Sequence, residues 1–235
     1  TFEDGRGLFI NPQTDLINLG NANPKAIYYE AQQRQDTLLN KRILEACSEE
    51  LAAKIPDMPL AFGAGAFRMK SRIDFAHSLT DFQNKFHAAV GALNDIKNVG
   101  GEKNYIFYWI VGSSVGGTGS GIVNDVLYQV NVIHQQIVGD GNPQLFLTMY
   151  MPEAYIERNH TEEKYSLNAY AVLSEMDAFK VMSNNNEQNR VMHRMALMSD
   201  YNLINKDRPY NPFFYLIPVD IQTDKGTNFG SPRTM

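Results

Sequence analysis

Residues 105–124 constrain the fold of this chain more than any other segment. They read YIFYWIVGSSVGGTGSGIVN: an apolar run, then four glycines within six residues, then apolar positions again. A run that is apolar on both faces is typical of a strand covered on each side, as in a parallel sheet. The residues after Gly121 have the spacing of a helix. The segment therefore predicts a buried strand that is joined to a helix by a short, glycine-rich junction.

The same alternation continues along the chain. Two more apolar runs, PQLFLTMYM (143–151) and PFFYLIPVD (212–220), read as buried strands, and helical patterns over 122–138 and 166–182 separate them. Strands that alternate with helices of this length imply βαβ crossovers. We therefore expect an α/β fold with a doubly wound, mostly parallel sheet and helices on both faces, in a single domain over residues 1–235.

The first hundred residues are mainly helical by the same criterion. Apolar residues about four apart predict one or two amphipathic helices between residues 23 and 55 and another helix over 73–98. Between them, PLAFGAGAFR (59–68) reads as a short strand that Gly63 and Gly65 interrupt.

Composition excludes several classes of protein. The net charge of −5 and the lack of a long basic run argue against nucleic acid as a partner. No apolar stretch approaches the roughly 20 residues of a membrane span, so we expect no membrane insertion. The single cysteine, Cys47, fits a reducing cytoplasm, and the five histidines show no metal-binding spacing. We expect a cytoplasmic protein with no metal-ligand cluster of its own.

The glycine-rich junction suits an anion. In open α/β sheets, ligands bind beyond the carboxyl ends of the strands, where free N–H groups and the dipole of the next helix favour negative charge. Glycine permits positive φ and removes Cβ atoms that would keep a phosphate away, and the hydroxyls of Ser114, Thr118 and Ser120 can donate. The alternative is a tight strand-to-helix turn with no ligand, although four glycines exceed what a turn requires. Neither the Walker A pattern nor the Rossmann GxGxxG pattern fits the junction.

A third pattern does fit. VGGTGSG (115–121) resembles the phosphate-binding loop of the tubulin and FtsZ superfamily, departing from it only in having Val115 where a small residue is usual. GAGAFR (63–68) resembles the loop of that superfamily that approaches the γ-phosphate. MPEAY (151–155) resembles the start of its ribose loop, and NAYAVLSEMDAF (168–179) a helix that contacts the base. In combination these blocks look most like the bacterial tubulin-like proteins.

The resemblance implies a site for GTP or GDP, with Mg²⁺ beside the phosphates. The implied phosphate contacts are Ser114, Gly116, Gly117, Thr118, Gly119 and Ser120 from the first loop, with Gly63, Ala64, Gly65 and Ala66 from the second. The implied ribose and base contacts are Glu153, Arg158, Asn168 and Asn228. Without the resemblance, Glu153 reads as a solvated side chain and Asn168 as a helix cap.

Three functions remain open at this stage. The first is a GTP-binding, tubulin-like protein that assembles head to tail, with itself or with a tubulin-like partner, and whose GTP hydrolysis depends on assembly. The second is a tubulin-like interaction module that binds nucleotide without polymerising or hydrolysing it, and the third is an α/β enzyme that acts on another phosphorylated molecule. Two elements of the superfamily find no match in this sequence: the amino-terminal phosphate loop and the acidic loop that acts on the neighbouring subunit's nucleotide. We therefore assign no catalytic residue and expect the chain to lack the first loop and the carboxy-terminal activation domain.

Overall fold

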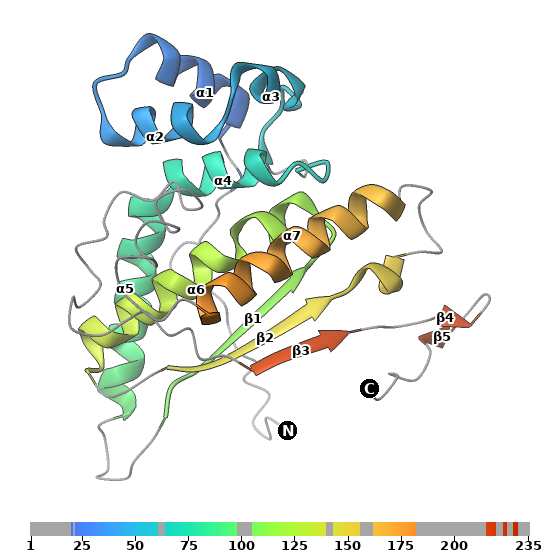
Figure 1. Cartoon of the computed structure of the whole chain (residues 1–235). Coiled ribbons are helices and arrows are strands. Elements are labelled where there is room, and N and C mark those ends of the chain that lie inside the picture. The colour runs from blue at the N-terminus through green and yellow to red at the C-terminus, as the bar shows by residue number, and fades with distance from the viewer. Residues whose placement is uncertain are drawn as a thin grey trace.

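Three parallel strands form a sheet on one side of the helices (Figure 1): β1 (Phe107–Ser113), β2 (Gln144–Tyr150) and β3 (Tyr215–Val219). Their order in the sheet follows their order in the chain, and both neighbouring pairs are parallel. Helix α6 (Gly117–Ile137) connects β1 to β2, and α7 (Glu162–Val181) lies between β2 and β3 in the sequence. The chain is thus an α/β protein with a parallel sheet flanked by helices, which confirms the predicted fold class.

This computed structural model does not describe every residue. Its description covers residues 20, 22–60, 64–97, 105–139, 143–155, 162–181, 215–219, 223–224 and 228–229.

One face of the sheet carries the main hydrophobic core. The alternate strand residues Tyr108, Leu145, Leu147 and Met149 are buried there against α6, α7 and α5 (Leu79–Lys97). The three helices lie together on this side of the strands in Figure 1. The core cluster also includes Val90, Ile106, Val123, Leu127, Val130, Ile133, Val172 and Met176.

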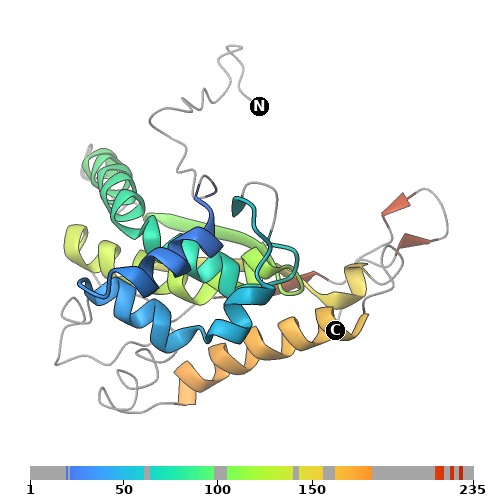
Figure 2. The ribbon, with the colours of Figure 1, turned by 90° about the horizontal axis from the view of Figure 1, so that it is seen from above.

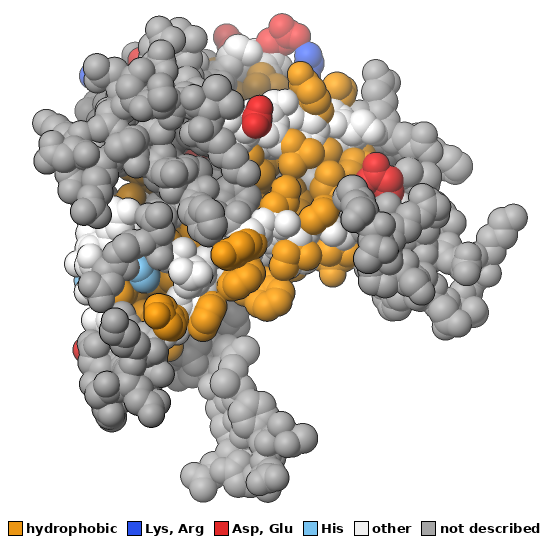
Figure 3. All heavy atoms as spheres, turned by 60° about the horizontal axis from the view of Figure 1, so that its bottom comes forward, with side chains coloured by type: hydrophobic (Ala, Val, Ile, Leu, Met, Phe, Trp, Pro, Cys, Tyr) orange, Lys and Arg blue, Asp and Glu red, His pale blue; other side chains and the backbone are white. Residues whose placement is uncertain are grey.

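The opposite face of the sheet is also apolar, and the described helices leave it exposed (Figure 3). Trp109, Phe146 and Tyr215 face one another in register across the three strands. Their rings stack, with centroid distances of 5.6 Å and 5.2 Å between neighbours. The strands are therefore apolar on both faces as predicted, and the presence of helices on this second face stays a prediction.

The amino-terminal segment forms a helical layer above α6, away from the strands (Figure 1), and Figure 2 shows this layer from above. It contains α1 (Pro24–Gln33), α2 (Leu38–Ala46) and α3 (Glu49–Lys54), three helices where the apolar spacing predicted one or two. Each helix begins at a side chain that accepts a hydrogen bond from a backbone N–H of its first turn, and these N-caps are Asn23, Thr37 and Ser48. Such caps start a new helix even where the hydrophobic spacing continues.

The helices of this layer share a second core with α4 (Arg68–His77). That core contains Tyr28, Ala31, Ile43, Cys47, Ala52, Ile55, Ile73 and Ala76. The predicted helix over 73–98 is two helices, because α4 begins earlier, at Arg68, and the chain breaks at Ser78 before α5.

The remaining elements are short. The 3₁₀ helix η2 (Pro152–Tyr155) follows β2, and β4 (Thr223–Asp224) pairs with β5 (Asn228–Phe229). The strand predicted within 59–68 falls partly on residues 61–63, outside the described residues, and Ala64–Phe67 form a turn rather than a strand. None of the described helices is long and apolar enough to span a bilayer.

Candidate functional site

The amino end of α6 presents three backbone N–H groups that have no partner among the described residues. Helix α6 begins at Gly117, four residues beyond the end of β1, and its N-cap, Gly116, has no side chain that could cap it. The first hydrogen bond of the helix runs from the N–H of Ser120 to the carbonyl of the N-cap, Gly116, at 3.2 Å. Within the described part of the chain, the N–H groups of Gly117, Thr118 and Gly119 are therefore free, and they lie at the positive end of a 21-residue helix, a favourable position for an anion.

Ser113, at the end of β1, holds the junction that leads to these groups. Its Oγ accepts hydrogen bonds from the N–H of Val115 at 3.2 Å and from that of Gly116 at 3.4 Å. This serine was not among the predicted site residues, and a serine three residues before the double glycine is a recognisable signal for such a turn.

The glycines of the junction are required mainly by close packing. A Cβ atom on Gly117 would lie 2.6 Å from the N atom of Phe67, and one on Gly119 would lie 2.7 Å from the N atom of Ser113. One on Gly121 would lie 2.7 Å from the carbonyl oxygen of Arg68. Real Cβ atoms do not approach backbone this closely, so glycine allows α6 to start directly against β1 and α4. The freedom of glycine to adopt positive φ is not used at these positions, which lie in helical or extended conformation.

Positive φ occurs instead in the turn over residues 64–67, the described part of the second predicted loop. Gly65 has a φ of 59° and Ala66 a φ of 60°, and the N–H of Phe67 donates to the Ala64 carbonyl at 3.0 Å. For alanine this left-handed conformation costs about 1 kcal/mol. The turn lies against Gly117, so the structure brings together Ala64, Gly65 and Ala66 with the amino end of α6. Gly63 lies outside the described residues.

The three predicted hydroxyl donors differ in their surroundings. Ser114 is buried, and its Oγ donates to the Tyr150 carbonyl at 3.0 Å. Ser120 is buried as well, and its Oγ donates to the Gly116 carbonyl at 2.5 Å. Thr118 is exposed on the first turn of α6. Phosphate contacts from these hydroxyls stay predictions, and in this structure only Thr118 has no partner inside the described protein.

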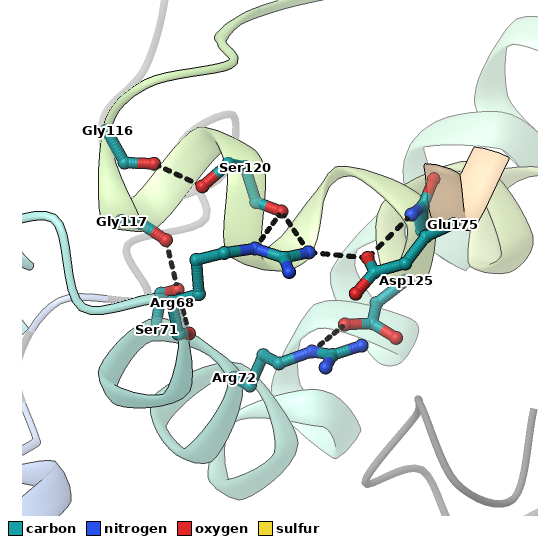
Figure 4. Close-up of polar contacts among 9 residues, drawn as sticks. Arg68, Ser71, Arg72, Gly116, Gly117, Ser120, Asp125 and Glu175 are labelled. Atoms are coloured by element: carbon teal, nitrogen blue, oxygen red, sulfur yellow. Dashed lines mark hydrogen bonds and ion pairs between the residues drawn. The ribbon is translucent and has the colours of Figure 1, made fainter. Parts of the chain in front are cut away.

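A network of charged side chains joins α4, α6 and α7 behind the glycines (Figure 4). The guanidinium of Arg68 donates to the Ser120 carbonyl through Nε at 3.1 Å and through a terminal nitrogen at 2.9 Å. The same guanidinium forms an ion pair with Glu175, whose Oε2 also accepts from Asn124 at 3.1 Å. Ser71 donates to the Gly117 carbonyl at 2.6 Å. The first turns of α6 are thereby fixed from outside the helix.

A second ion pair lies deeper in the same layer (Figure 4). Arg72 Nε is 3.9 Å from Asp125 Oδ2, and Asp125 is buried. Burial raises the pKa of Asp125 to about 7, and the positive charge of Arg72 opposes that rise.

The sequence prediction missed Arg68 and Glu175, although Glu175 lies two helical turns after Asn168 and therefore on the same face of α7.

Asn168 bridges the two predicted loops. Its Nδ2 donates to the Ala66 carbonyl at 3.1 Å and to the Val115 carbonyl at 2.8 Å, and the residue is buried. An amide nitrogen carries two protons, so both donors of Asn168 are used inside the protein. Its predicted contact with a base stays a prediction.

The other predicted ribose and base contacts share no described hydrogen bond with this cluster or lie outside the described residues. Glu153 is exposed on η2, directly after β2. Arg158 lies outside the described residues. Asn228 is paired with Asp224 in the β4–β5 ribbon, and its side chain is not described.

The fold and the site together define an α/β protein in which free helix N–H groups lie beyond the carboxyl end of a parallel strand, beside a strained turn. A family model described as "Tubulin like" matches residues 37–230, and the chain belongs to this family. No curated protein and no solved structure matches the chain at a significant level.

Proposed function

We propose that this chain is a GTP-binding protein whose phosphate site is the amino end of α6. The observation that carries the proposal is the group of free N–H donors at Gly117, Thr118 and Gly119 in a member of the tubulin-like family. Backbone donors at the positive end of a helix match the charge and the acceptor geometry of a phosphate group. The proposal takes GTP or GDP as the nucleotide, by analogy with the superfamily that the sequence resembles.

The two predicted loops have different roles in this proposal. In this proposal Gly116 to Ser120 hold the phosphates, and the turn with Ala64, Gly65 and Ala66 contacts the γ-phosphate. Glu153, Arg158 and Asn228 remain the proposed contacts for the sugar and the base. Among the described residues no group of three or more acidic, histidine or cysteine side chains could hold a metal ion. In this proposal Mg²⁺ is held mainly by phosphate oxygens and water, and it would neutralise phosphate charge.

We further propose that the protein assembles head to tail and that GTP hydrolysis depends on assembly. A head-to-tail contact is heterologous, and it produces open filaments when its rotation does not close into a ring. The rate of GTP hydrolysis per molecule should then rise with protein concentration, in parallel with the mass of sedimented polymer. GTP binding without polymer or hydrolysis at any concentration would favour the non-polymerising interaction module.

The binding site is tested by substitution at Gly116. A side chain there meets open space, since a Cβ atom would have only Ser113 Oγ nearby, at 4.0 Å. The backbone of Gly116 (φ −74°, ψ 151°) also suits a capping residue. Gly116→Asp and Gly116→Asn should both cap α6 and raise the free energy of unfolding by a few tenths to about 1 kcal/mol.

The two variants should differ in nucleotide binding. Gly116→Asp places a negative charge at the phosphate site, whereas Gly116→Asn places a neutral group of the same size there. We expect Gly116→Asp to lose at least about tenfold more affinity for a fluorescent GTP analogue than Gly116→Asn. ATP serves as competitor to test selectivity for guanine. Parent-level affinity in Gly116→Asp would refute a phosphate site at this helix end.

A further inference from the structure

Helix α7 contacts the same two segments at two points along its length. Asn168 bridges the carbonyls of Ala66 and Val115, and two turns later Glu175 bridges the side chains of Arg68 and Asn124. At each point one partner belongs to the 64–67 turn or the start of α4, and the other to the β1–α6 junction or to α6 itself. The helix therefore joins the turn and the start of α4 to the β1–α6 junction and α6 at both points.

The Asn168 end of this arrangement is closer to the proposed phosphate site. Ala66 is held at a φ of 60°, a conformation that alanine adopts only when its surroundings enforce it. The carbonyl of that residue accepts one of the two Asn168 protons, and the carbonyl of Val115, two residues before Gly117, accepts the other. Both contacts join positions more than 50 residues apart in the chain, and they are buried or partly buried.

We propose that Asn168 is a positioning residue that sets the spacing between the 64–67 turn and the free N–H groups of α6. This inference rests on the function proposed above, because it gives Asn168 a role in phosphate binding. It also differs from the role implied by the superfamily resemblance, in which this asparagine contacts the base. A positioning residue affects every nucleoside triphosphate equally, whereas a base contact affects one base more than another.

The first test compares nucleotide affinities for the parent chain, Asn168→Ala and Asn168→Asp. The aspartate keeps the size of the side chain but turns carboxylate oxygens toward two carbonyl oxygens, so both hydrogen bonds are lost without a cavity. We expect the affinities for GTP, ITP and ATP to fall by the same factor, about tenfold. A changed ratio among the three nucleotides would overturn the inference in favour of a base contact.

The matched control is Asn131→Ala. Asn131 is also a buried asparagine whose Nδ2 donates to a backbone carbonyl, that of Leu127 within α6, and it touches neither loop. This substitution should leave all three affinities within about twofold of the parent values. A loss as large as that of Asn168→Ala would show that the effect is general destabilisation, which would also overturn the inference.

The second test needs no nucleotide. Hydrogen exchange should be faster by about tenfold in the peptides covering 64–67 and 115–120 of Asn168→Ala and Asn168→Asp, and unchanged there in Asn131→Ala. Exchange at the parent rate in both segments would overturn the positioning role. If the parent chain binds no GTP, the proposed function fails while this measurement still decides whether Asn168 joins the two segments.

Discussion

Gly121 on α6 packs directly against Arg68 on α4: a Cβ atom at Gly121 would lie 2.7 Å from the Arg68 carbonyl oxygen. This backbone cannot move away easily, because Arg68 is held by Ser120 and Glu175. We predict that Gly121→Ala lowers the free energy of unfolding by about 2–3 kcal/mol, measured by urea denaturation. Gly91→Ala is the control, since a Cβ atom there meets nothing within 4 Å. Because Gly91 lies in the interior of α5, Gly91→Ala should instead raise the free energy of unfolding by about 0.5–1 kcal/mol. A similar decrease in the free energy of unfolding of both variants would contradict this explanation of the glycines.

A substitution at Ala66 should stabilise the protein, in contrast to Gly121→Ala. Its φ of 60° strains alanine but not glycine. After allowing for the greater freedom of glycine in the unfolded chain, Ala66→Gly should raise the free energy of unfolding by about 0.5 kcal/mol. The comparison is Ala92→Gly, in the helical interior of α5, which should lower it by about 1 kcal/mol. A loss of stability in both variants would mean that Ala66 is not strained in solution.

Two buried carboxyl groups predict a dependence of stability on pH. Burial raises the pKa of Asp74 to about 6, with Lys70 opposing the rise, and it raises the pKa of Asp125 to about 7. Both values exceed the ordinary 3.8, so the folded protein binds these protons more tightly than the unfolded chain does. Stability therefore falls as pH rises from about 4, and the fall is complete above about 6 for Asp74 and 7 for Asp125.

The size of this effect is measurable by urea denaturation at a series of pH values. Between pH 5 and pH 8 the parent should lose about 1 kcal/mol through Asp74 and about 2–3 kcal/mol through Asp125. Asp74→Asn and Asp125→Asn should each abolish the part of the pH dependence of the free energy of unfolding that comes from the replaced carboxyl group. This holds even if the substitution changes the stability at a single pH. A parent whose stability rises over this range, or variants with the parent's slope, would contradict the assigned pKa directions.

The exposed sheet face can be followed through Trp109, the single tryptophan of the chain. Its side chain is 66% exposed, although its Nε1 donates to Thr148 Oγ1 at 2.8 Å. We predict that acrylamide quenches the fluorescence of the unassembled protein efficiently, and that Trp109→Phe abolishes the signal without unfolding the sheet. Weak quenching of the monomer would mean that further protein covers this face.

Much of the architecture follows from local patterns. The apolar run before Gly116 and its position ahead of a helical pattern predicted β1 and α6, and the repeated alternation predicted the parallel sheet. The proximity of the two glycine-rich segments was implied by the superfamily resemblance alone, whereas the strand, the helix and the sheet were predicted from the residues. These features depend on periodicity and composition within short windows.

The roles of individual residues depend on partners that are distant in the sequence. Gly121 is glycine because Arg68, 53 residues earlier, lies against it, and no local pattern reveals that contact. The amide of Asn168 is turned inward by carbonyls that are 102 and 53 positions away. The three amino-terminal helices were merged because hydrophobic spacing outweighed the capping signals of Thr37 and Ser48.

The central claim is that the amino end of α6 binds the phosphates of GTP. The most direct measurement is NMR of the chain labelled with ¹⁵N-glycine and ¹⁵N-threonine, titrated with GTP and Mg²⁺. We predict that the amide resonances of Gly117, Thr118 and Gly119 shift with saturation, while that of Gly139, at the far end of α6, stays in place. GTP binding that leaves these three resonances unmoved, or no change anywhere in the spectrum at millimolar GTP, would contradict the account.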